Sequence, residues 1–196
     1  AYRMKQAEKN RKSREHILTH AFAEFAAHGY AGSSLNLICA DGGISKGMLY
    51  HYYPNKDALY LACIEKLFAE MTDWLSARIC IPDMTVKQYF AVRMQFFQRH
   101  PAHRQLFYDV LMYPPAHLAA RVNACRTAFD DLNNTALLAV LAKEKLTDRL
   151  STEDAIRQFR AFVNFLGVYI REDATGDAEQ KAGELLDTLL YGLIAR

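Results

Sequence analysis

The sequence has little of what builds sheets and loops. Glycine and proline supply only 9 and 5 of the 196 residues, and β-branched residues are few outside short runs. Residues of high helix propensity, chiefly alanine, leucine, glutamate, lysine and glutamine, recur in long stretches instead. Because 51% of the residues are hydrophobic, the chain can bury a substantial core. We therefore expect an all-α protein with almost no β-strand.

The sequence also lacks the residue spacings of metal sites and disulfide frameworks. Its four cysteines show no Cys-x-x-Cys or Cys/His pattern and lie within apolar helical patterns. We expect all four, Cys39, Cys63, Cys80 and Cys125, to be reduced and buried, as in a cytoplasmic protein. No phosphate-binding loop is present, so no cofactor is predicted.

A long hydrophobic run is absent as well. The most apolar stretch, residues 161–170, is interrupted by Asn164 and is shorter than the roughly 20 residues that cross a bilayer. No apolar segment follows the amino terminus, so no export signal is predicted. These features predict a soluble protein that stays in the cytoplasm.

The formal net charge is only +2, but the basic residues are concentrated at the front of the chain. A basic amino-terminal arm suits contact with phosphates. A solvated tail is the alternative, because charge runs at chain ends are usually solvated. Against the single acidic residue Glu8, the arm contains Arg3, Lys5, Lys9, Arg11, Lys12 and Arg14.

The apolar spacing predicts three helices at the front, over residues 13–29, 34–43 and 45–53, with a glycine turn between the second and third. Serine side chains at 34 and 45 are placed to cap the second and third helices, and Asn55 can cap a long helix that follows. About nine helices are expected in all, the rest over residues 57–74, 86–97, 100–113, from 116 to about 146, 151–170 and from about 177.

The start of the third helix has the residue types of a surface that reads DNA. In a recognition helix, the first turn reaches base edges in the major groove. Here Lys46 can donate to guanine acceptors, and Ser45 can pair with either kind of base edge. Gly47 has no side chain, so the backbone can come close to DNA.

Other polar residues around this turn suit contacts with bases or phosphates. Tyrosine hydroxyls, a lysine and amides at a helix start are phosphate donors that fix register without reading sequence. Packing between helices is the alternative for the aromatic run at residues 50–52. These further candidates are Ser34, Asn36, Tyr50, Tyr52 and Lys56.

The segment from Ile38 to Leu59 resembles the amino-terminal domain of the TetR family of transcriptional regulators. It reads Ile-Cys-Ala-Asp-Gly-Gly-Ile-Ser-Lys-Gly-Met-Leu-Tyr-His-Tyr-Tyr-Pro-Asn-Lys-Asp-Ala-Leu. The family pattern is Ile-Ala-x-x-Ala-Gly-Val-Ser-x-Gly-x-Leu-Tyr-x-His/Tyr-Phe-x-x-Lys-x-x-Leu. The chain departs from it at Cys39 and Gly42, where alanine is usual, and at Tyr53, where phenylalanine is usual. Glycine within a helix costs about 1 kcal/mol relative to alanine, so Gly42 is expected to loosen the second helix.

The resemblance implies a ligand-responsive regulator, expected to be a repressor. Residues 1–56 would form a helix-turn-helix DNA-binding domain with its basic arm, and residues 57–196 a larger helical domain for ligand binding and dimerisation. A dimer would place two recognition helices in successive major grooves of a palindromic operator. A small effector would spread them and release the double-stranded DNA. Carried to this chain, the contact set is Ser34, Asn36, Ser45, Lys46, Gly47, Tyr50, Tyr52 and Lys56.

The last two expected helices are apolar on more than one face, over residues 156–170 and 185–194. A helix of this kind needs more than one packing partner. The same helices of a second copy would supply it, which predicts a homodimer through a four-helix interface. A monomer core that uses all these faces is the alternative.

No motif in the carboxy-terminal half identifies the effector. Arg93 shares a helical face with phenylalanines, and Asn164 interrupts an apolar helix, so either can anchor a ligand in an apolar pocket. A snorkelling arginine and a hydrogen-bonded core amide are the alternatives. For a small hydrophobic or aromatic effector, the predicted lining residues are Met71, Trp74, Arg93, Phe97, Phe107, Phe129 and Asn164, although core packing is the alternative for the apolar ones.

Two other functions are compatible with parts of the sequence. An enzyme is not expected: residues 100–109 contain two histidines, a tyrosine and an aspartate, but His100-Pro101 fits a helix start and no nucleophile accompanies them. The remaining alternative is a DNA-binding regulator that responds to no ligand, or to oxidation through Cys63 or Cys125. Buried cysteines are generally inert, which counts against the second form.

Overall fold

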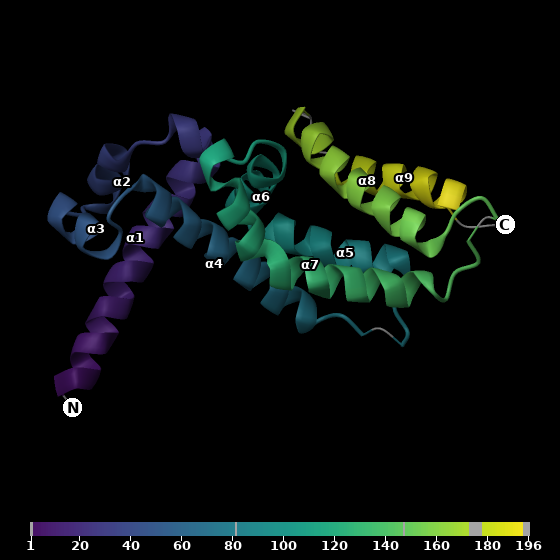
Figure 1. Ribbon diagram of the computed structural model, residues 1–196, viewed down its shortest axis with the longest axis horizontal. Helices are drawn as coiled ribbons and strands as arrows, with labels where there is room; N and C mark the ends of the chain where they lie inside the picture. Colours follow the sequence, from purple (N-terminus) through teal and green to yellow (C-terminus); the bar gives the residue numbers. More distant parts are fainter. Residues whose placement is uncertain (1, 81, 147, 173–177, 194–196) are drawn as a thin grey trace. The chain divides into compact units, whose positions relative to one another are not determined.

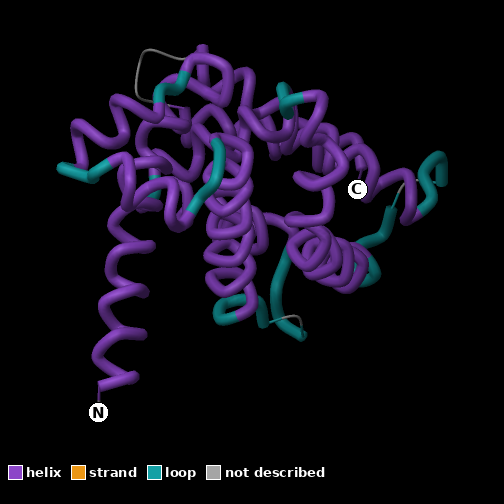
Figure 2. Tube along the Cα trace, turned by 60° about the vertical axis from the view of Figure 1, so that its left-hand side comes forward, coloured by secondary structure: helices purple, strands orange, loops and turns teal. Residues whose placement is uncertain are grey.

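The computed structural model describes the backbone of residues 2–80, 82–146, 148–172 and 178–193, and their side chains except at 2–5, 164, 167–172, 178–179 and 192–193. Over this part of the chain it contains nine α-helices, one short 3-10 helix and no strand (Figure 2). The expected all-α fold is confirmed. The elements are α1 (Tyr2–Gly32), α2 (Leu35–Gly42), α3 (Lys46–Tyr52), α4 (Lys56–Ser76), α5 (Val86–Arg99), α6 (Pro101–Met112), η1 (Ala116–Leu118), α7 (Ala119–Leu141), α8 (Thr152–Glu172) and α9 (Ala178–Leu193).

Side-chain caps start several helices where the sequence predicts them. The hydroxyls of Ser34 and Ser45 accept from backbone amides of α2 and α3, and the Asn55 side chain accepts from the amide of Ala58 at 2.8 Å. Ser151 caps α8 by accepting from the amide of Asp154 at 3.0 Å. Each cap satisfies an amide that has no partner within its helix.

Two helix ends differ from expectation. α1 begins at Tyr2 rather than near Ser13, because the intervening residues favour helix and Glu8 pairs with Arg11 and Lys12 one turn later, at 2.9 and 3.5 Å. α7 ends at Leu141 rather than near residue 146, and the Lys143 ammonium just beyond it donates to the carbonyls of Pro82 and Met84.

Contacts divide the chain into two compact units, Ala1–Phe68 with Ala102–Arg126, and Ala69–Pro101 with Thr127–Arg196. All three boundaries fall within helices, since α4, α6 and α7 each contribute residues to both units. The sequence-based boundary at residue 56 concerns function rather than compactness and stays a prediction.

The first unit packs α2, α3 and the start of α4 against the second half of α1 (Figure 1). Gly29 interrupts α1 with a positive φ of 65°, at the glycine where the sequence predicts the helix to end. The amino-terminal turns of α1 project beyond α2 and α3 in both views (Figures 1 and 2). The fully buried side chains of this unit include Ile17, Phe25, Ile38, Leu49, Leu59, Tyr60 and Ile64.

The second unit is a bundle whose core comes from α5, α7, α8 and α9. α8 and α9 lie side by side in both views and contact each other (Figures 1 and 2). One face of each helix is buried, as periodic apolar spacing predicts. The core includes Tyr89, Phe90, Leu137, Phe159, Leu166, Ala182 and Leu186. Within the described residues, no helix is both long and apolar enough to span a membrane.

Candidate nucleic-acid interface and ligand site

A tight turn joins α2 to α3 and fixes how α3 is presented. Gly43 adopts the left-handed conformation with φ 58°, and its amide donates to the carbonyl of Ala40 at 3.3 Å. The amide of Ile44 donates to the carbonyl of Cys39 at 2.8 Å. Buried side chains at Ile44 and Leu49 then hold the inner face of α3 against the unit. The opposite face of this short helix is therefore presented to solvent.

Five of the eight predicted DNA contacts are exposed: Asn36 on α2, and Ser45, Lys46, Gly47 and Tyr50 at the start of α3 and along it. The Tyr50 side chain is 50% exposed, although large aromatic residues are usually more buried. A Cβ atom built on Gly47 would meet no atom within 4 Å, so the backbone there is open to an approaching molecule. The hydroxyl of Ser45 is engaged, since it accepts from the amide of Met48 at 3.1 Å.

The other three predicted contacts are held by the protein itself. The Tyr52 hydroxyl donates to Asn10 Oδ1 at 3.2 Å, and the Lys56 ammonium donates to the carbonyl of Ser33 at 2.8 Å. The amide of Ser34, expected to be available to phosphate, donates instead to the carboxylate of buried Glu24 at 2.8 Å. These hydrogen bonds connect the helices of the first unit to one another. A DNA contact from the three residues stays a prediction.

Leu37 is a candidate that the sequence analysis did not single out. It lies on α2 next to Asn36 and is 49% exposed, while Ile38 alone is buried on that helix. Leu35 and Cys39, on the same side of α2 as Ile38, are only partly covered. An exposed leucine beside polar residues can contact thymine methyl groups or sugars. The available sequence signal is that Leu37, although apolar, lies off the helical face that Leu35 and Ile38 share.

The basic arm is partly neutralised on its own helix. Arg11 pairs with Glu8 at 2.9 Å and with Glu15 at 3.5 Å, and its hydrogen bond lowers the pKa of the Glu8 carboxyl. The Arg14 guanidinium lies 5.4 Å from the centre of the Tyr52 ring. Exposed pairs of this kind are weak, so they leave the arm able to exchange partners with phosphate groups.

A polar network joins the end of α1 to the start of α4 and to η1, all within the first unit. The Tyr30 hydroxyl donates to Asp57 Oδ1, and His117 Nε2 lies 3.2 Å from the same oxygen. The hydrogen bond to the carboxylate raises the pKa of Tyr30 to about 12. Hydrogen bonds from Tyr30 and then His117 lower the pKa of Asp57. The network therefore ties the first turn of α4 to the end of α1 and to η1.

The predicted ligand residues occupy different surroundings. Met71, Phe97 and Phe129 are buried in the second unit, whereas Phe107 is buried in the first and packs on Phe68 with ring centres 6.0 Å apart. Asn164 lies outside the described side chains. The structure therefore does not show these residues as one pocket, and their role in ligand binding stays a prediction.

Trp74 and Arg93 keep polar partners within the second unit. The Trp74 indole donates to the carbonyl of Val92 at 3.0 Å, while the Arg78 and Arg99 guanidinium groups lie 3.4 and 5.2 Å from its ring centre. Arg93 is only 6% exposed, so the snorkelling interpretation is wrong for it. Its Nη1 donates to Asn133 Oδ1 at 2.6 Å.

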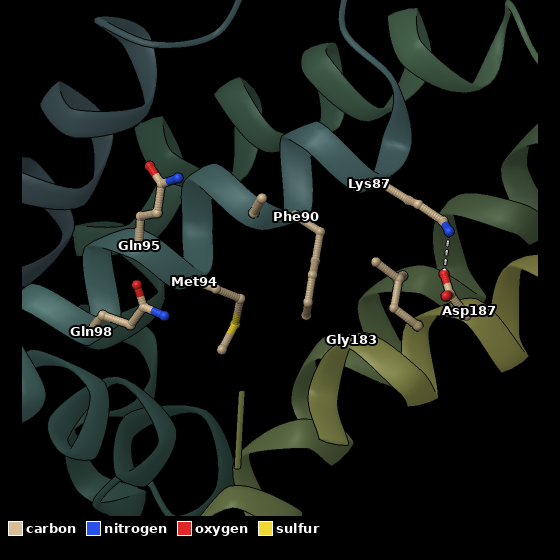
Figure 3. Close-up of a pocket in the computed structure, with 9 residues that line it drawn as sticks. Lys87, Phe90, Met94, Gln95, Gln98, Gly183 and Asp187 are labelled. Carbon is tan, nitrogen blue, oxygen red and sulfur yellow. Dashed lines mark ion pairs between the residues drawn. The ribbon is translucent and has the colours of Figure 1, made fainter. Parts of the chain in front are cut away.

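A groove of about 440 Å³ lies between α5 and α9 (Figure 3). Phe90 and Met94 form its apolar floor, and Lys87 pairs with Asp187 at 2.5 Å at one end. Gly183 faces the groove from α9 in the close-up (Figure 3). None of the groove residues belongs to the predicted ligand set.

The cysteines are less uniform than expected. Cys63 is buried, but Cys39 and Cys125 are only partly covered and Cys80 is exposed, so the expectation that all four are buried is wrong. Burial raises the pKa of the Cys63 and Cys125 thiols, which disfavours the reactive thiolate. Among the described side chains, no group of histidines, cysteines and carboxylates could hold a metal ion.

Comparison with known proteins identifies the front of the chain. The family described as "Bacterial regulatory proteins, tetR family" matches residues 17–63. The chain is 31% identical over 103 residues to the HTH-type transcriptional repressor SCO4008 of Streptomyces coelicolor, which covers 52% of each chain. It is 28% identical over 96 residues to the HTH-type transcriptional regulator RutR of Escherichia coli, over 46% of this chain and 44% of RutR. The chain thus spans about half the length of the curated relatives that it matches.

Solved structures share the fold along nearly the whole chain. The transcriptional regulator FadR from Bacillus subtilis, in complex with stearoyl-CoA, aligns with a TM-score of 0.73 over 91% of this chain and 98% of FadR, at 15% identity. The ketosteroid transcriptional regulator KstR2 of Mycobacterium tuberculosis aligns with a TM-score of 0.67 over 93% and 95% of the two chains, at 21% identity.

Three observations indicate the same class of protein: the helix-turn-helix fold, the matched family segment and the relatives. The relatives named here are transcriptional regulators rather than enzymes. Residues 17–63 of the chain therefore match the TetR family of bacterial regulatory proteins.

Proposed function

We propose that this protein is a ligand-responsive transcriptional repressor that binds a palindromic operator as a homodimer in the cytoplasm. The observation that carries the proposal is the exposed edge of α3, where Lys46, Gly47 and Tyr50 face solvent on a helix fixed by Ser45 and Leu49. A lysine at the first turn of a recognition helix can bind guanine O6 and N7. The relative SCO4008 is named as a repressor, which supports the same role here.

A dimer gives this short edge enough contact for specific binding. α3 has only seven residues, so one copy reads a few base pairs. Two copies would meet half-sites about 34 Å apart, one turn of the duplex. An effector that changes this spacing would release the operator, and by linkage the operator would weaken effector binding by the same factor.

The effector is proposed to be a small hydrophobic or aromatic molecule that binds the second unit. Two observations support a ligand there: the groove between α5 and α9, and the enclosed Arg93 among aromatic side chains. FadR of Bacillus subtilis, which shares the fold, was solved in complex with stearoyl-CoA. α4 runs from the second unit to the polar network around Asp57, so it is the proposed route by which the ligand acts on α3.

The test removes the Lys46 and Tyr50 side chains from the exposed edge of α3. A DNA duplex is first selected from a random pool with the wild-type protein, and its binding by Lys46→Ala with Tyr50→Ala is then measured by gel retardation. Each lost base contact costs about 1–3 kcal/mol, and two contacts together about 2–6 kcal/mol, so affinity should fall at least about thirtyfold. Tyr113→Ala with Lys145→Ala removes the same residue types from exposed positions elsewhere and should leave affinity unchanged. Undiminished binding by the first variant, with unaltered helical circular dichroism, would refute the assignment.

A further inference from the structure

The interior of the second unit holds a cation among neutral groups. Arg93 lies on α5 and is only 6% exposed. Its Nη1 donates to Asn133 Oδ1 at 2.6 Å and lies 3.4 Å from the Tyr89 hydroxyl. Its guanidinium carbon is 5.4 Å from the centre of the Phe129 ring. An amide, a phenol and an aromatic ring surround the charge without neutralising it.

No carboxylate compensates Arg93 among the residues described here. The ion pairs of the second unit join other residues, such as Lys87 with Asp187 and Arg157 with Asp154. An arginine stays charged at any physiological pH, so it cannot escape the penalty by losing a proton. Burying such a charge is strongly unfavourable unless an anion accompanies it. The enclosed Arg93 guanidinium therefore lacks the carboxylate partner that usually offsets the cost of burying such a charge.

The groups around Arg93 are fixed, yet the guanidinium keeps spare donors. Asn133 Oδ1 accepts from both Arg93 and Tyr89, while Asn133 Nδ2 donates to the carbonyl of Phe129 at 2.7 Å. The hydrogen bonds of Arg93 use Nη1. No fully enclosed polar side-chain atom of the described residues lacks a partner, so the remaining N–H groups of Arg93 must retain some access to open space. A planar fork of this kind suits a carboxylate, which it can bind through two hydrogen bonds.

We propose that Arg93 binds the carboxylate, or an equivalent single negative charge, of an otherwise apolar effector. This inference rests on the proposed function, because it names the chemical class of the effector. A single guanidinium balances one negative charge, and the buried Phe97 and Phe129 on neighbouring turns of α5 and α7 favour an apolar body. The neutral cluster of Tyr89 and Asn133 holds the guanidinium in place while leaving its charge available.

The test compares anions with neutral molecules of the same shape. Benzoate and benzamide, and acetate and acetamide, are titrated into the wild-type protein at constant ionic strength, with melting temperature and calorimetric Kd as readouts. Benzoate should raise the melting temperature more than benzamide and bind at least tenfold more tightly, with the same order for the acetate pair. Equal effects of the charged and neutral members on the wild-type protein would overturn the proposal.

Variants then locate the preference. Arg93→Met should abolish the advantage of benzoate over benzamide, and its melting temperature without ligand should equal or exceed that of the wild type, because Tyr89 still satisfies Asn133. Arg157→Met removes an exposed arginine from α8 of the same unit, outside the groove, and should keep the wild-type preference. A preference that survives in Arg93→Met would overturn the proposal. If that variant does not fold, Arg93→Lys should retain part of the preference, and full loss there would count against an anion site.

The outcome separates this inference from the function on which it rests. Binding of benzoate through Arg93, with no acid in a panel able to release the selected DNA, would uphold the anion site and contradict ligand-controlled repression. Release of DNA by benzamide as readily as by benzoate, unaltered in Arg93→Met, would uphold the repressor and overturn the anion site.

Discussion

Gly47 leaves the backbone of α3 bare at the point where a close approach to DNA is proposed. The residue is exposed, and a Cβ atom added there would meet nothing within 4 Å in the protein. A glycine in a helix is costly, so its presence here needs a reason other than packing. Access of the DNA backbone or a base edge is such a reason.

Gly47→Ala should therefore separate stability from DNA binding. The unfolding free energy should stay the same or rise by up to about 1 kcal/mol, because alanine favours helix and the methyl group has room. Affinity for the selected duplex should fall at least severalfold, since the methyl group would occupy the space into which DNA is proposed to fit. Urea unfolding and gel retardation measure the two quantities. A variant that binds the duplex as tightly as the wild type would show that DNA does not approach this face of Gly47.

Part of the proposed DNA-binding site can be predicted from the sequence, and part cannot. Tyr50 follows the buried Leu49 directly and so lies about 100° from it around the helix, and Lys46 carries a charge, so spacing and residue type together predict their exposure. Tyr52 and Lys56 contact Asn10 and the carbonyl of Ser33, which are 42 and 23 residues distant in sequence. No local pattern contains such contacts. They appear only when α1 is packed against the helix-turn-helix.

Two helical glycines, Gly42 at the end of α2 and Gly183 in α9, differ in how much room surrounds them. A Cβ atom on Gly42 would lie 2.5 Å from Ile44 Cδ1 and 2.9 Å from His20 Cδ2, and the Gly42 carbonyl is 2.7 Å from His16 Nε2. The absent side chain thus lets α1 approach α2 closely, so Gly42 has a packing role beyond the expected loosening of the helix. Gly183 lies within α9, and a Cβ atom there would meet nothing within 4 Å.

Alanine at the two positions should change stability in opposite directions. Gly42→Ala should lower the unfolding free energy by about 1–3 kcal/mol, because the methyl group overfills a packed contact. Gly183→Ala should raise it by about 1 kcal/mol, the difference in helix propensity in a helix interior. Each variant controls for the other in urea unfolding followed by circular dichroism. Stabilisation by Gly42→Ala would mean that α1 does not need this close approach.

Helices are predictable from sequence where a cap marks them. Ser34, Ser45 and Asn55 place three starts correctly, because each side chain satisfies an amide only a few residues away. The start of α1 has no capping residue to mark it, and the charged pairs within the helix do not indicate where it begins. Beyond the end of α7, Lys143 contacts residues about 60 positions earlier, and sequence spacing does not contain such contacts.

α8 and α9 each bury one face in the core of the second unit, and each also exposes a large aromatic side chain. Phe165 on α8 is 56% exposed and Tyr191 on α9 is 64% exposed. The core of the second unit already uses Phe159 and Leu166 from α8 and Leu186 from α9. Exposed rings on two adjacent helices suit a symmetric contact with the same helices of a second copy.

Phe165→Glu with Tyr191→Glu should convert the proposed dimer into a monomer. The two carboxylates would face their symmetric counterparts in a desolvated interface, where unpaired charges are strongly unfavourable. The monomer would hold only one half-site, so affinity for the palindromic duplex should fall by about two orders of magnitude or more, while each α3 stays intact. Tyr113→Glu places the same charge at a side chain that is 71% exposed in the first unit and should leave both mass and affinity unchanged. Sedimentation equilibrium measures the mass and gel retardation the affinity, and a double variant that still sediments as a dimer would place the interface on other helices.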